Sequence, residues 1–498
     1  MPARRMMIQA TASHAGKSLL AAALCRWFAR QGLRVAPFKA WNMSLNAAPA
    51  AGGEIGWAQA LQASACGIEA RVEMNPVLVK PSGPGECQLI LSGQPAGRLQ
   101  AGETGPREAA IAAIRSAWAA IEAEHDLVVL EGAGSPAEIN LLDRDLANMW
   151  MAREADAPVL VVGDIDRGGV FAALLGTWML APEAERIRGF IINKFRGDAR
   201  RLEGGLEALQ RKTGVPTLGI VPYHPPELPE EDALGVPAGS LPPADGRRLR
   251  IGVVRLPHMA NFSDFDSLAL EPETALAYSF SPRVLAEADV LILPGTRATV
   301  ADLAALRAAG LEPVIRAAAA AGKPVWGICG GYQMLAESIA DPEGVETDAP
   351  LTRGLGLLPV QIRFERHKRS EAVAGECAEC ELPGLPGLPV RGYFMQHGRA
   401  GNTPHPLFSL RASAGGEPER EGCLQGSVAG TALHDIFNGE HREAAFRRAV
   451  VAGWRRQCGL PAITAHAPLP GLAARLDAWT EHVIGHLDMA AIARIAGL

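Results

Sequence analysis

Short apolar runs alternate with longer alanine-rich stretches along the first half of the chain. The runs cover residues 127–130, 159–162, 190–193 and 218–221, and the stretches between them have the periodicity of amphipathic helices. Buried strands that alternate with helices are typical of a parallel sheet with helices on its faces. We therefore predict a parallel-sheet α/β domain over residues 1–222.

A second unit of the same class follows. Residues 223–249 are rich in proline, glycine and acidic side chains and have no apolar period, which predicts a linker. The alternation then restarts in the segments RIGVVRLP, DVLILPGT and KPVWGICGGYQML, so we predict a second α/β domain over residues 250–446. Residues 447–498 are amphipathic and predict a C-terminal helical extension that packs against a domain.

Composition narrows the class of protein. A chain of 498 residues with 48% hydrophobic and 20% charged residues indicates a globular protein of more than one domain. The net charge of −6 gives no general attraction for nucleic acid or for an anionic membrane. Eight scattered cysteines, no signal-peptide pattern and no long apolar segment favour a cytoplasmic protein. Its oligomeric state stays open, with a homo-oligomer as one alternative.

The N-terminal segment carries a variant of the phosphate-binding P-loop. Residues 10–18 read ATASHAGKS, and a helical pattern follows. Backbone N–H groups around Ser13 and Gly16 would bind phosphate oxygens, Lys17 would reach the β and γ phosphates, and the Ser18 hydroxyl would ligate Mg²⁺. Ala10 replaces the usual first glycine. An accidental Gly-Lys-Ser in an ordinary loop is the alternative.

Carboxylates downstream are candidates for the metal. Glu131 ends the apolar run DLVVLE, and a glycine-rich turn at 132–134 follows it. Carboxylates at the carboxyl end of a strand beside a P-loop can meet its Mg²⁺, and glycines let a ligand approach the backbone. We assign Glu131 and Glu54 as metal ligands. A strand-end acid in solvent is the alternative for Glu131.

Two further strand-end residues suit a nucleotide site. Lys39 in VAPFKAW is a candidate for contact with phosphates or with an acyl oxygen, and a solvated lysine is the alternative. Asn193 in FIINKF is a candidate for hydrogen bonding to the adenine edge, and a turn-forming asparagine is the alternative.

The second half carries a candidate nucleophile. Gly327-Ile-Cys329-Gly330-Gly331 follows a strand and precedes a helix, which predicts an elbow that exposes the Cys329 thiol at a helix N-terminus. A buried structural cysteine is the alternative. His434 in GTALHDIF is the candidate base. The N–H groups of Gly330 and Gly295 are candidates for an oxyanion hole, although Gly295 also suits an ordinary turn.

These motifs carry a family resemblance. The first half resembles dethiobiotin-synthetase-like P-loop domains, and the second resembles class I glutamine amidotransferases, which have a flavodoxin-like fold. The whole set is similar to the cobyric acid synthase family along nearly the full length. The segments that carry this resemblance are VAPFKAWNMSLNA, GGEIGWAQALQ, MNPVLVKPSG, EGAGSPAEINLLDRDLANM, DIDRGGVFA, GFIINKFRGD, NFSDFDSLALEP, PGTRATVADL and GICGGYQML.

The resemblance implies an activity. Members of this family use ATP, Mg²⁺ and glutamine to amidate the b, d, e and g carboxylates of adenosylcobyrinic acid a,c-diamide, which gives adenosylcobyric acid in cobalamin biosynthesis. Cobyrinate a,c-diamide synthase, built from the same domain types, is the nearest alternative. A regulatory nucleotide-binding module of the partitioning-ATPase kind, with an inactive amidotransferase domain, is an alternative from another class.

The chain also departs from the family pattern. Trp41 and Trp57 stand where Gln and Arg are expected, and the segment GYEIHMG is replaced by GYFMQHG at 392–398, which displaces its histidine by one residue. Triad amidotransferases usually carry His-x-Glu, but Ile436 follows His434 at that spacing. The sequence therefore predicts a Cys329–His434 dyad without naming a third member.

Overall fold

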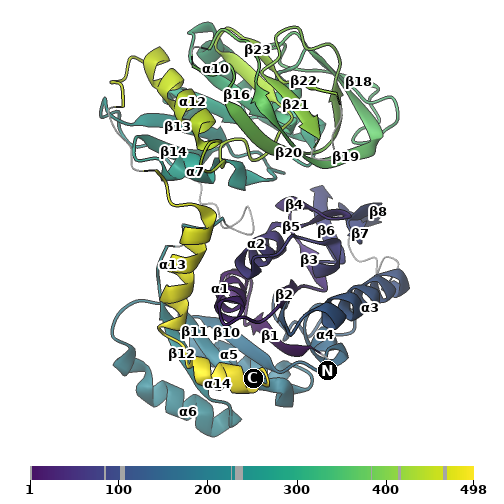
Figure 1. Ribbon diagram of the computed structural model, residues 1–498, viewed down its shortest axis with the longest axis vertical. Helices are drawn as coiled ribbons and strands as arrows, with labels where there is room; N and C mark the ends of the chain where they lie inside the picture. Colours follow the sequence, from purple (N-terminus) through teal and green to yellow (C-terminus); the bar gives the residue numbers. More distant parts are fainter. Residues whose placement is uncertain are drawn as a thin grey trace. The chain divides into compact units, whose positions relative to one another are not determined.

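The computed structural model describes residues 3–83, 86–100, 107–225, 227–229, 239–382, 384–412, 417–463 and 468–498. The chain forms two compact units, each with its own hydrophobic core. Unit 1 contains Met1–Glu231 together with Pro470–Leu498, and unit 2 contains Asp232–Leu469. Chain segments from both ends therefore build unit 1 (Figure 1).

A parallel sheet forms the centre of unit 1. Its strands follow the order β12-β11-β10-β1-β9-β2, and each neighbouring pair is parallel. The strands are short and apolar because both faces of the sheet are covered by helices. They are β1 (Arg4–Ala10), β2 (Val35–Phe38), β9 (Leu127–Glu131), β10 (Val159–Asp164), β11 (Ile187–Phe195) and β12 (Thr217–Pro222). The predicted α/β fold is confirmed here.

Helices and two small sheets complete the first part of unit 1. The helices are α1 (Lys17–Arg30), α2 (Trp57–Cys66), α3 (Arg107–Glu124), α4 (Met149–Glu154), α5 (Val170–Leu180) and α6 (Glu203–Thr213). One small sheet has the order β3-β6-β7-β8, and β4 pairs with β5 in the other. These strands are β3 (Trp41–Met43), β4 (Ala47–Ala50), β5 (Gly53–Gly56), β6 (Val77–Gly83), β7 (Glu86–Leu91) and β8 (Gln94–Gln100).

Unit 2 has a second largely parallel sheet. Its order is β14-β13-β15-β16-β24-β23, and β23 is antiparallel to its neighbour β24. The strands are β13 (Leu249–Val254), β14 (Thr274–Ser279), β15 (Val290–Leu293), β16 (Val325–Ile328), β23 (Cys423–Gln425) and β24 (Val428–Thr431). The helices are α7 (Asp266–Leu270), α8 (Pro282–Ala286), α9 (Thr299–Ala308), α10 (Leu311–Ala320), α11 (Gly330–Leu335) and α12 (Ala444–Gln457).

A mixed sheet forms the rest of unit 2. It has the order β18-β17-β19-β21-β22, and β20 pairs with β19. Its strands are β17 (Ser338–Ala340), β18 (Leu351–Arg353), β19 (Gln361–Cys377), β20 (Pro389–Ala400), β21 (Phe408–Ala412) and β22 (Glu419–Glu421). The long pair β19–β20 carries the segment 392–398 that departs from the family pattern.

The predicted C-terminal extension, residues 447–498, is divided between the two units. Helix α12 packs into unit 2, where Trp454 lies edge-on to Trp326 at a ring-centroid distance of 5.5 Å. Helices α13 (Leu472–Ile484) and α14 (Met489–Ile495) belong instead to unit 1. The division follows from two separate apolar faces, because each face buries its side chains in a different core.

Helix α13 lies along α1, the helix that begins at the predicted P-loop (Figure 1). The Trp479 indole packs into the core of unit 1, and its Nε1 donates to the Leu19 carbonyl at 2.8 Å. Arg26 on α1 pairs with Asp477 at 2.8 Å. The C-terminal segment therefore contributes to the support of α1 and of the loop before it.

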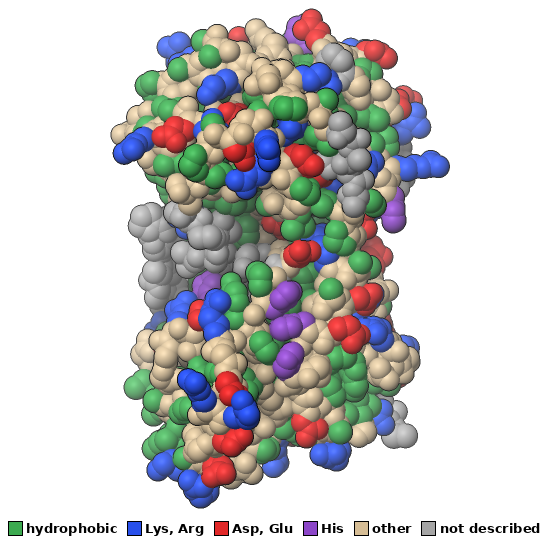
Figure 2. All heavy atoms as spheres, turned by 90° about the vertical axis from the view of Figure 1, so that its left-hand side faces the viewer, with side chains coloured by type: hydrophobic (Ala, Val, Ile, Leu, Met, Phe, Trp, Pro, Cys, Tyr) green, Lys and Arg blue, Asp and Glu red, His purple; other side chains and the backbone are tan. Residues whose placement is uncertain are grey.

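Histidine side chains gather at the surface in this region (Figure 2). The His482 ring lies 4.8 Å from that of His224 and 5.3 Å from that of His486, between centroids. Burial, together with the two neighbouring histidines, holds the pKa of His482 below its ordinary value. Across the described residues, no group of three or more His, Cys, Asp or Glu side chains can hold a metal ion.

Replacement of Trp479 with Ala should destabilise unit 1. The change removes a buried indole and one hydrogen bond, so we expect a loss of about 3 kcal/mol in the free energy of unfolding. Thermal unfolding of the full chain measures it. The control is Glu481→Ala, which removes a partly exposed ion pair with Arg30 and should cost less than about 1 kcal/mol. Equal unfolding temperatures for the two variants would contradict the assigned role of α13.

Candidate active sites

The loop between β1 and α1 has the geometry of a phosphate-binding loop. Gly16 precedes α1 with φ 98°, and a Cβ atom there would collide with the amide group of Asn193. Glycine is therefore required at this position. Lys17 is buried, and its Nζ donates to the carbonyls of Ala12 at 3.2 Å and Gly134 at 3.1 Å. The lysine thus spans from its own loop to the glycine-rich turn after β9. Ser13 is exposed in the same loop.

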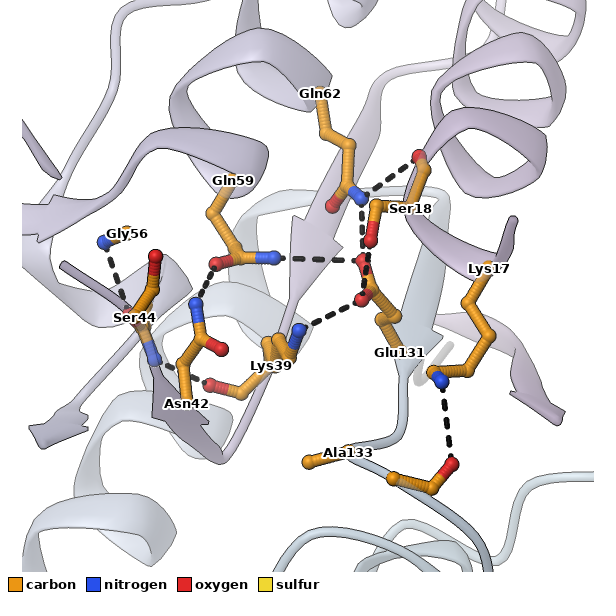
Figure 3. Close-up of polar contacts among 12 residues, drawn as sticks. Lys17, Ser18, Lys39, Asn42, Ser44, Gly56, Gln59, Gln62, Glu131 and Ala133 are labelled. Atoms are coloured by element: carbon orange, nitrogen blue, oxygen red, sulfur yellow. Dashed lines mark hydrogen bonds and ion pairs between the residues drawn. The ribbon is translucent and has the colours of Figure 1, made fainter. Parts of the chain in front are cut away.

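Glu131 is the centre of a buried polar cluster (Figure 3). Its Oε1 accepts from Ser18 Oγ at 2.9 Å and from Lys39 Nζ at 2.7 Å. The side chain has no exposed surface, and Lys39 is only 3% exposed. A buried carboxylate is tolerated because a cation and several donors compensate its charge. Neither Glu131 nor Lys39 is a solvated surface group, so the alternative of a solvent-exposed side chain is excluded for both.

Two glutamines complete this cluster. Gln62 Nε2 donates to Glu131 Oε2 at 2.6 Å and to the Ser18 carbonyl at 3.2 Å, and Gln59 Nε2 donates to Glu131 Oε2 at 3.4 Å (Figure 3). Both lie on α2, one turn apart on the same face. Sequence reasoning missed them. The signal was present in GGEIGWAQALQ, where two glutamines occupy helical positions that amphipathic spacing assigns to the core.

The oxygen set around Glu131 fits Mg²⁺. Carboxylate and hydroxyl oxygens are the ligands this hard cation prefers, and Mg²⁺ usually keeps several waters. Gln62 Oε1 is buried and accepts no hydrogen bond within the described residues, so it can accept one from such a water. Ser18 and Glu131 are therefore the residues that would hold the ion.

Glu54 is placed differently. It lies on β5, is 1% exposed and pairs with the equally buried Lys80 of β6 at 2.5 Å. This ion pair joins the two small sheets of unit 1. The role of Glu54 as a metal ligand stays a prediction.

The end of β11 supports the P-loop backbone. Asn193 Nδ2 donates to the Ala15 carbonyl at 2.8 Å, and Lys194 Nζ donates to the His14 carbonyl at 2.6 Å. Lys194 also pairs with Asp164 of the neighbouring strand β10 at 3.1 Å. Asn193 thus has a structural contact that the sequence did not reveal. Its predicted contact with adenine stays a prediction.

Cys329 lies at a strained turn between β16 and α11. Its backbone has φ 49° and ψ −108°, values that non-glycine residues rarely adopt, and its N–H donates to the Thr431 carbonyl at 2.8 Å. A Cβ atom at Gly331 would collide with the Leu293 carbonyl, so a small neighbour is required. This geometry matches a nucleophile elbow.

His434 contacts both Cys329 and a carboxylate that the sequence did not assign. His434 lies close enough to Cys329 for the charge of Cys329 to favour the protonated ring, and His434 Nδ1 lies 2.7 Å from Asp264 Oδ2. Asp264 is 2% exposed and also accepts from the Asp435 N–H at 2.8 Å. The Tyr393 ring stacks on His434 at 5.4 Å between centroids. Cys329, His434 and Asp264 therefore form a triad, whose third member comes from the motif NFSDFDSL.

Electrostatics favour a charged His434. Burial opposes the charged ring, but the negative charges of Asp264 and Cys329 outweigh burial and raise the pKa of His434 to about 10. The imidazolium form is therefore retained through neutral pH, and it can stabilise a neighbouring thiolate.

The two candidate oxyanion glycines converge on this triad. A Cβ atom at Gly295 would lie 2.7 Å from His434 Cε1, and one at Gly330 would lie 3.1 Å from the Thr296 backbone nitrogen. Gly295 therefore approaches His434, and Gly330 approaches the turn that follows Gly295, as closely as only glycine permits. Gly330 also begins α11, where N–H groups lack partners within the helix.

The altered segment 392–398 contacts helix α11 through a glutamine. Gln396 Oε1 accepts from Gln333 Nε2 at 3.0 Å, and Gln333 lies on α11 one turn after Cys329. The displaced His397 instead lies 3.0 Å from the Glu365 carbonyl through its Nδ1.

Comparison with known proteins assigns the family. Residues 6–235 match the model of the CobQ/CobB/MinD/ParA nucleotide binding domain, and residues 250–442 match that of the CobB/CobQ-like glutamine amidotransferase domain. A cobyric acid synthase of Sorangium cellulosum is 45% identical and covers 100% of this chain and 99% of its own. One of Desulforudis audaxviator is 47% identical and covers 95% of each chain.

The chain belongs to the cobyric acid synthase family. It therefore combines an ATP-binding P-loop unit with a glutamine amidotransferase unit, as the resemblance predicted. Of the helices in the described ranges, none has the length and hydropathy to cross a membrane.

Replacement of Asp264 with Asn should impair glutamine hydrolysis. The loss of its charge lowers the pKa of His434 and leaves one amide oxygen for the two N–H donors of His434 and Asp435, so we expect kcat/KM for glutamine to fall on the order of 100-fold or more. The imidazolium will then be lost at lower pH, so the alkaline limb of the pH–rate profile should move to lower pH. Glutamate release, measured against pH, checks both effects.

The matched control is Asp289→Asn. Asp289 pairs with Arg250 at the opposite, amino-terminal edge of the same sheet, at 2.8 Å. Its replacement should leave glutamine hydrolysis within about twofold. An Asp264→Asn enzyme with an unchanged pH profile would contradict a triad.

Proposed function

We propose that this protein amidates the b, d, e and g carboxylates of adenosylcobyrinic acid a,c-diamide to give adenosylcobyric acid, with ATP and glutamine as co-substrates. The observation that carries the proposal is the presence of two assembled sites in a chain of this family: the Cys329–His434–Asp264 triad and the Glu131 cluster at the P-loop. All eight cysteines are unpaired, which supports a reducing, cytoplasmic setting.

Unit 2 would supply ammonia. The Cys329 thiolate attacks the side-chain carboxamide carbon of glutamine, and the N–H groups of Gly330 and Gly295 stabilise the oxygen as it becomes negative. His434 then donates its proton to the leaving nitrogen, which departs as ammonia and leaves a γ-glutamyl thioester. Water, deprotonated by His434, hydrolyses the thioester to glutamate. Asp264 keeps the ring oriented throughout and stabilises its charged form before the first proton transfer and after the second.

Unit 1 would activate the acceptor. A corrinoid carboxylate attacks the γ-phosphorus of ATP, ADP leaves, and the acyl phosphate then reacts with ammonia to give the amide and inorganic phosphate. Lys17 and the loop N–H groups would bind the phosphate oxygens, and Lys39, which donates to Glu131 at 2.7 Å, would add a second positive charge to this cluster. Mg²⁺, held by Ser18 and Glu131, would offset phosphate charge.

Product analysis tests the substrate assignment. With adenosylcobyrinic acid a,c-diamide, ATP, Mg²⁺ and glutamine, the product should gain four amides, which mass spectrometry counts directly. Failure to amidate this diamide, combined with the addition of two amides to cobyrinic acid, would identify the diamide synthase instead. Nucleotide binding without amidation of either corrinoid would favour a regulatory module.

Replacement of Cys329 with Ala should separate the two sites. The variant loses the thiolate that opens glutamine but keeps the P-loop unit, so added ammonium should restore amidation. Lys17→Ala removes charge stabilisation from phosphoryl transfer, so amidation should fall about 1000-fold with either nitrogen source. The rate of amide formation with each source is the measurement.

The control for the lysine variant is Lys212→Ala, which changes an exposed lysine on α6. It should retain normal activity with both sources. Glutamine-dependent turnover by Cys329→Ala, or equal ammonium rescue of Lys17→Ala, would overturn the assignment of the two sites.

A further inference from the structure

A second buried carboxylate lies beside the triad without belonging to it. Asp302, in the first turn of α9, has no exposed side-chain surface. Its Oδ1 lies 2.7 Å from His258 Nδ1, and its Oδ2 accepts from the His258 N–H at 3.1 Å and from Thr296 Oγ1 at 2.5 Å. One carboxylate therefore binds donors from two segments that are separate in the sequence.

The two segments are those that bear the oxyanion turn and the third triad member. Thr296 directly follows Gly295, and the Gly295 carbonyl accepts from the Ala260 N–H at 2.9 Å. The His258 carbonyl accepts from the Arg297 N–H at 3.0 Å and lies 3.1 Å from Thr296 Oγ1. Residues 258–260 thus run against residues 295–297, and the same segment continues to Asp264 in the 3₁₀ helix Phe262–Phe265.

We propose that Asp302 is a positioning residue for glutamine hydrolysis. Through His258 and Thr296 it fixes the Gly295 turn relative to the segment that carries Asp264. This inference rests on the proposed glutaminase activity of unit 2 and adds a residue that acts without contact to the reacting atoms.

The chemistry of the site explains why such positioning matters. An oxyanion donor contributes most when it is already placed where negative charge develops, and a loosely supported donor loses that benefit. Residues on loops need support from buried hydrogen bonds to hold such a position. Gly295 lies on a turn and Asp264 on a short 3₁₀ segment; Asp302 contacts Thr296, which adjoins Gly295, and His258, which precedes Asp264 in the same segment.

The carboxylate of Asp302 offers acceptor oxygens to the three donors around it. A carboxylate has only acceptor oxygens, whereas the amide of Asn presents N–H donors on one side. Asp302→Asn would therefore set an N–H group against the donor of His258 or of Thr296. Burial raises the pKa of Asp302, and the hydrogen bonds from Thr296 and His258 oppose that rise. These hydrogen bonds therefore reduce the rise in pKa that burial causes without removing it.

Asp302→Asn is tested by two reactions of Cys329. Glutamine hydrolysis needs the oxyanion turn, whereas alkylation of the thiolate by iodoacetamide needs the Cys329–His434 pair but no oxyanion donor. We expect kcat for glutamine hydrolysis to fall about 10- to 100-fold, with KM changed less than about threefold, and the alkylation rate to stay within about twofold of wild type. Ammonium-dependent amidation should be unchanged.

Four further variants keep the test decisive. Thr296→Val removes one hydroxyl donor with little change of shape, and it should lower kcat in the same direction by a smaller factor. His258→Asn retains a side-chain N–H donor and should keep more activity than His258→Leu. Asp289→Asn, at the opposite edge of the sheet, should behave like wild type in both reactions.

The outcomes separate this proposal from the proposed function. Equal losses of hydrolysis and alkylation in Asp302→Asn and Thr296→Val would show a merely structural carboxylate and overturn the inference. Unchanged kcat in both variants would overturn it as well. Absence of glutamine hydrolysis by the wild-type chain would instead contradict the proposed function.

Discussion

The chemistry of each unit depends on the shared direction of its parallel strands. Because all strands of such a sheet end at one edge, the residues that follow them meet there even when they are distant in sequence. In unit 1 this edge brings the P-loop after β1 to Glu131 at the end of β9 and Lys39 after β2. In unit 2 it brings Cys329 after β16 to His434 after β24.

Charged side chains at both edges are buried, so each needs a partner that compensates its charge. Lys39 with Glu131 and His434 with Asp264 each pair groups that are no more than 3% exposed. Such pairs add little net stability because desolvation offsets their attraction, and their loss leaves an uncompensated charge. The same low dielectric strengthens their effect on a bound phosphate or on a thiolate. These pairs are therefore explained better by a role in the reactions than by a contribution to the stability of the fold.

The sequence predicted the local parts of this arrangement more completely than the long-range parts. The apolar runs at 127–130, 159–162 and 190–193 lie within β9, β10 and β11, because continuous apolar runs of that length are typical of strands buried on both faces. The loops around Gly16 and Cys329 were visible because glycine spacing reflects local backbone geometry. Asp264 was missed because its contact with His434 spans 170 residues and no spacing encodes it. The division of the C-terminal extension was missed for a similar reason, since amphipathicity shows that a face is buried but not which core buries it.

Asp264 also explains how the triad tolerates Ile436 where related amidotransferases have glutamate. Ile436 is 2% exposed and packs into the core of unit 2, so a carboxylate in its place would need a buried partner of its own. Asp264 instead reaches His434 from the segment after β13 and accepts a backbone N–H as well. A negative charge beside the imidazole is thereby kept, although the residue that supplies it comes from another part of the chain. A consequence is that the orientation of the histidine depends on the same segment that adjoins the proposed oxyanion turn, so both halves of the proposed glutaminase site share one support.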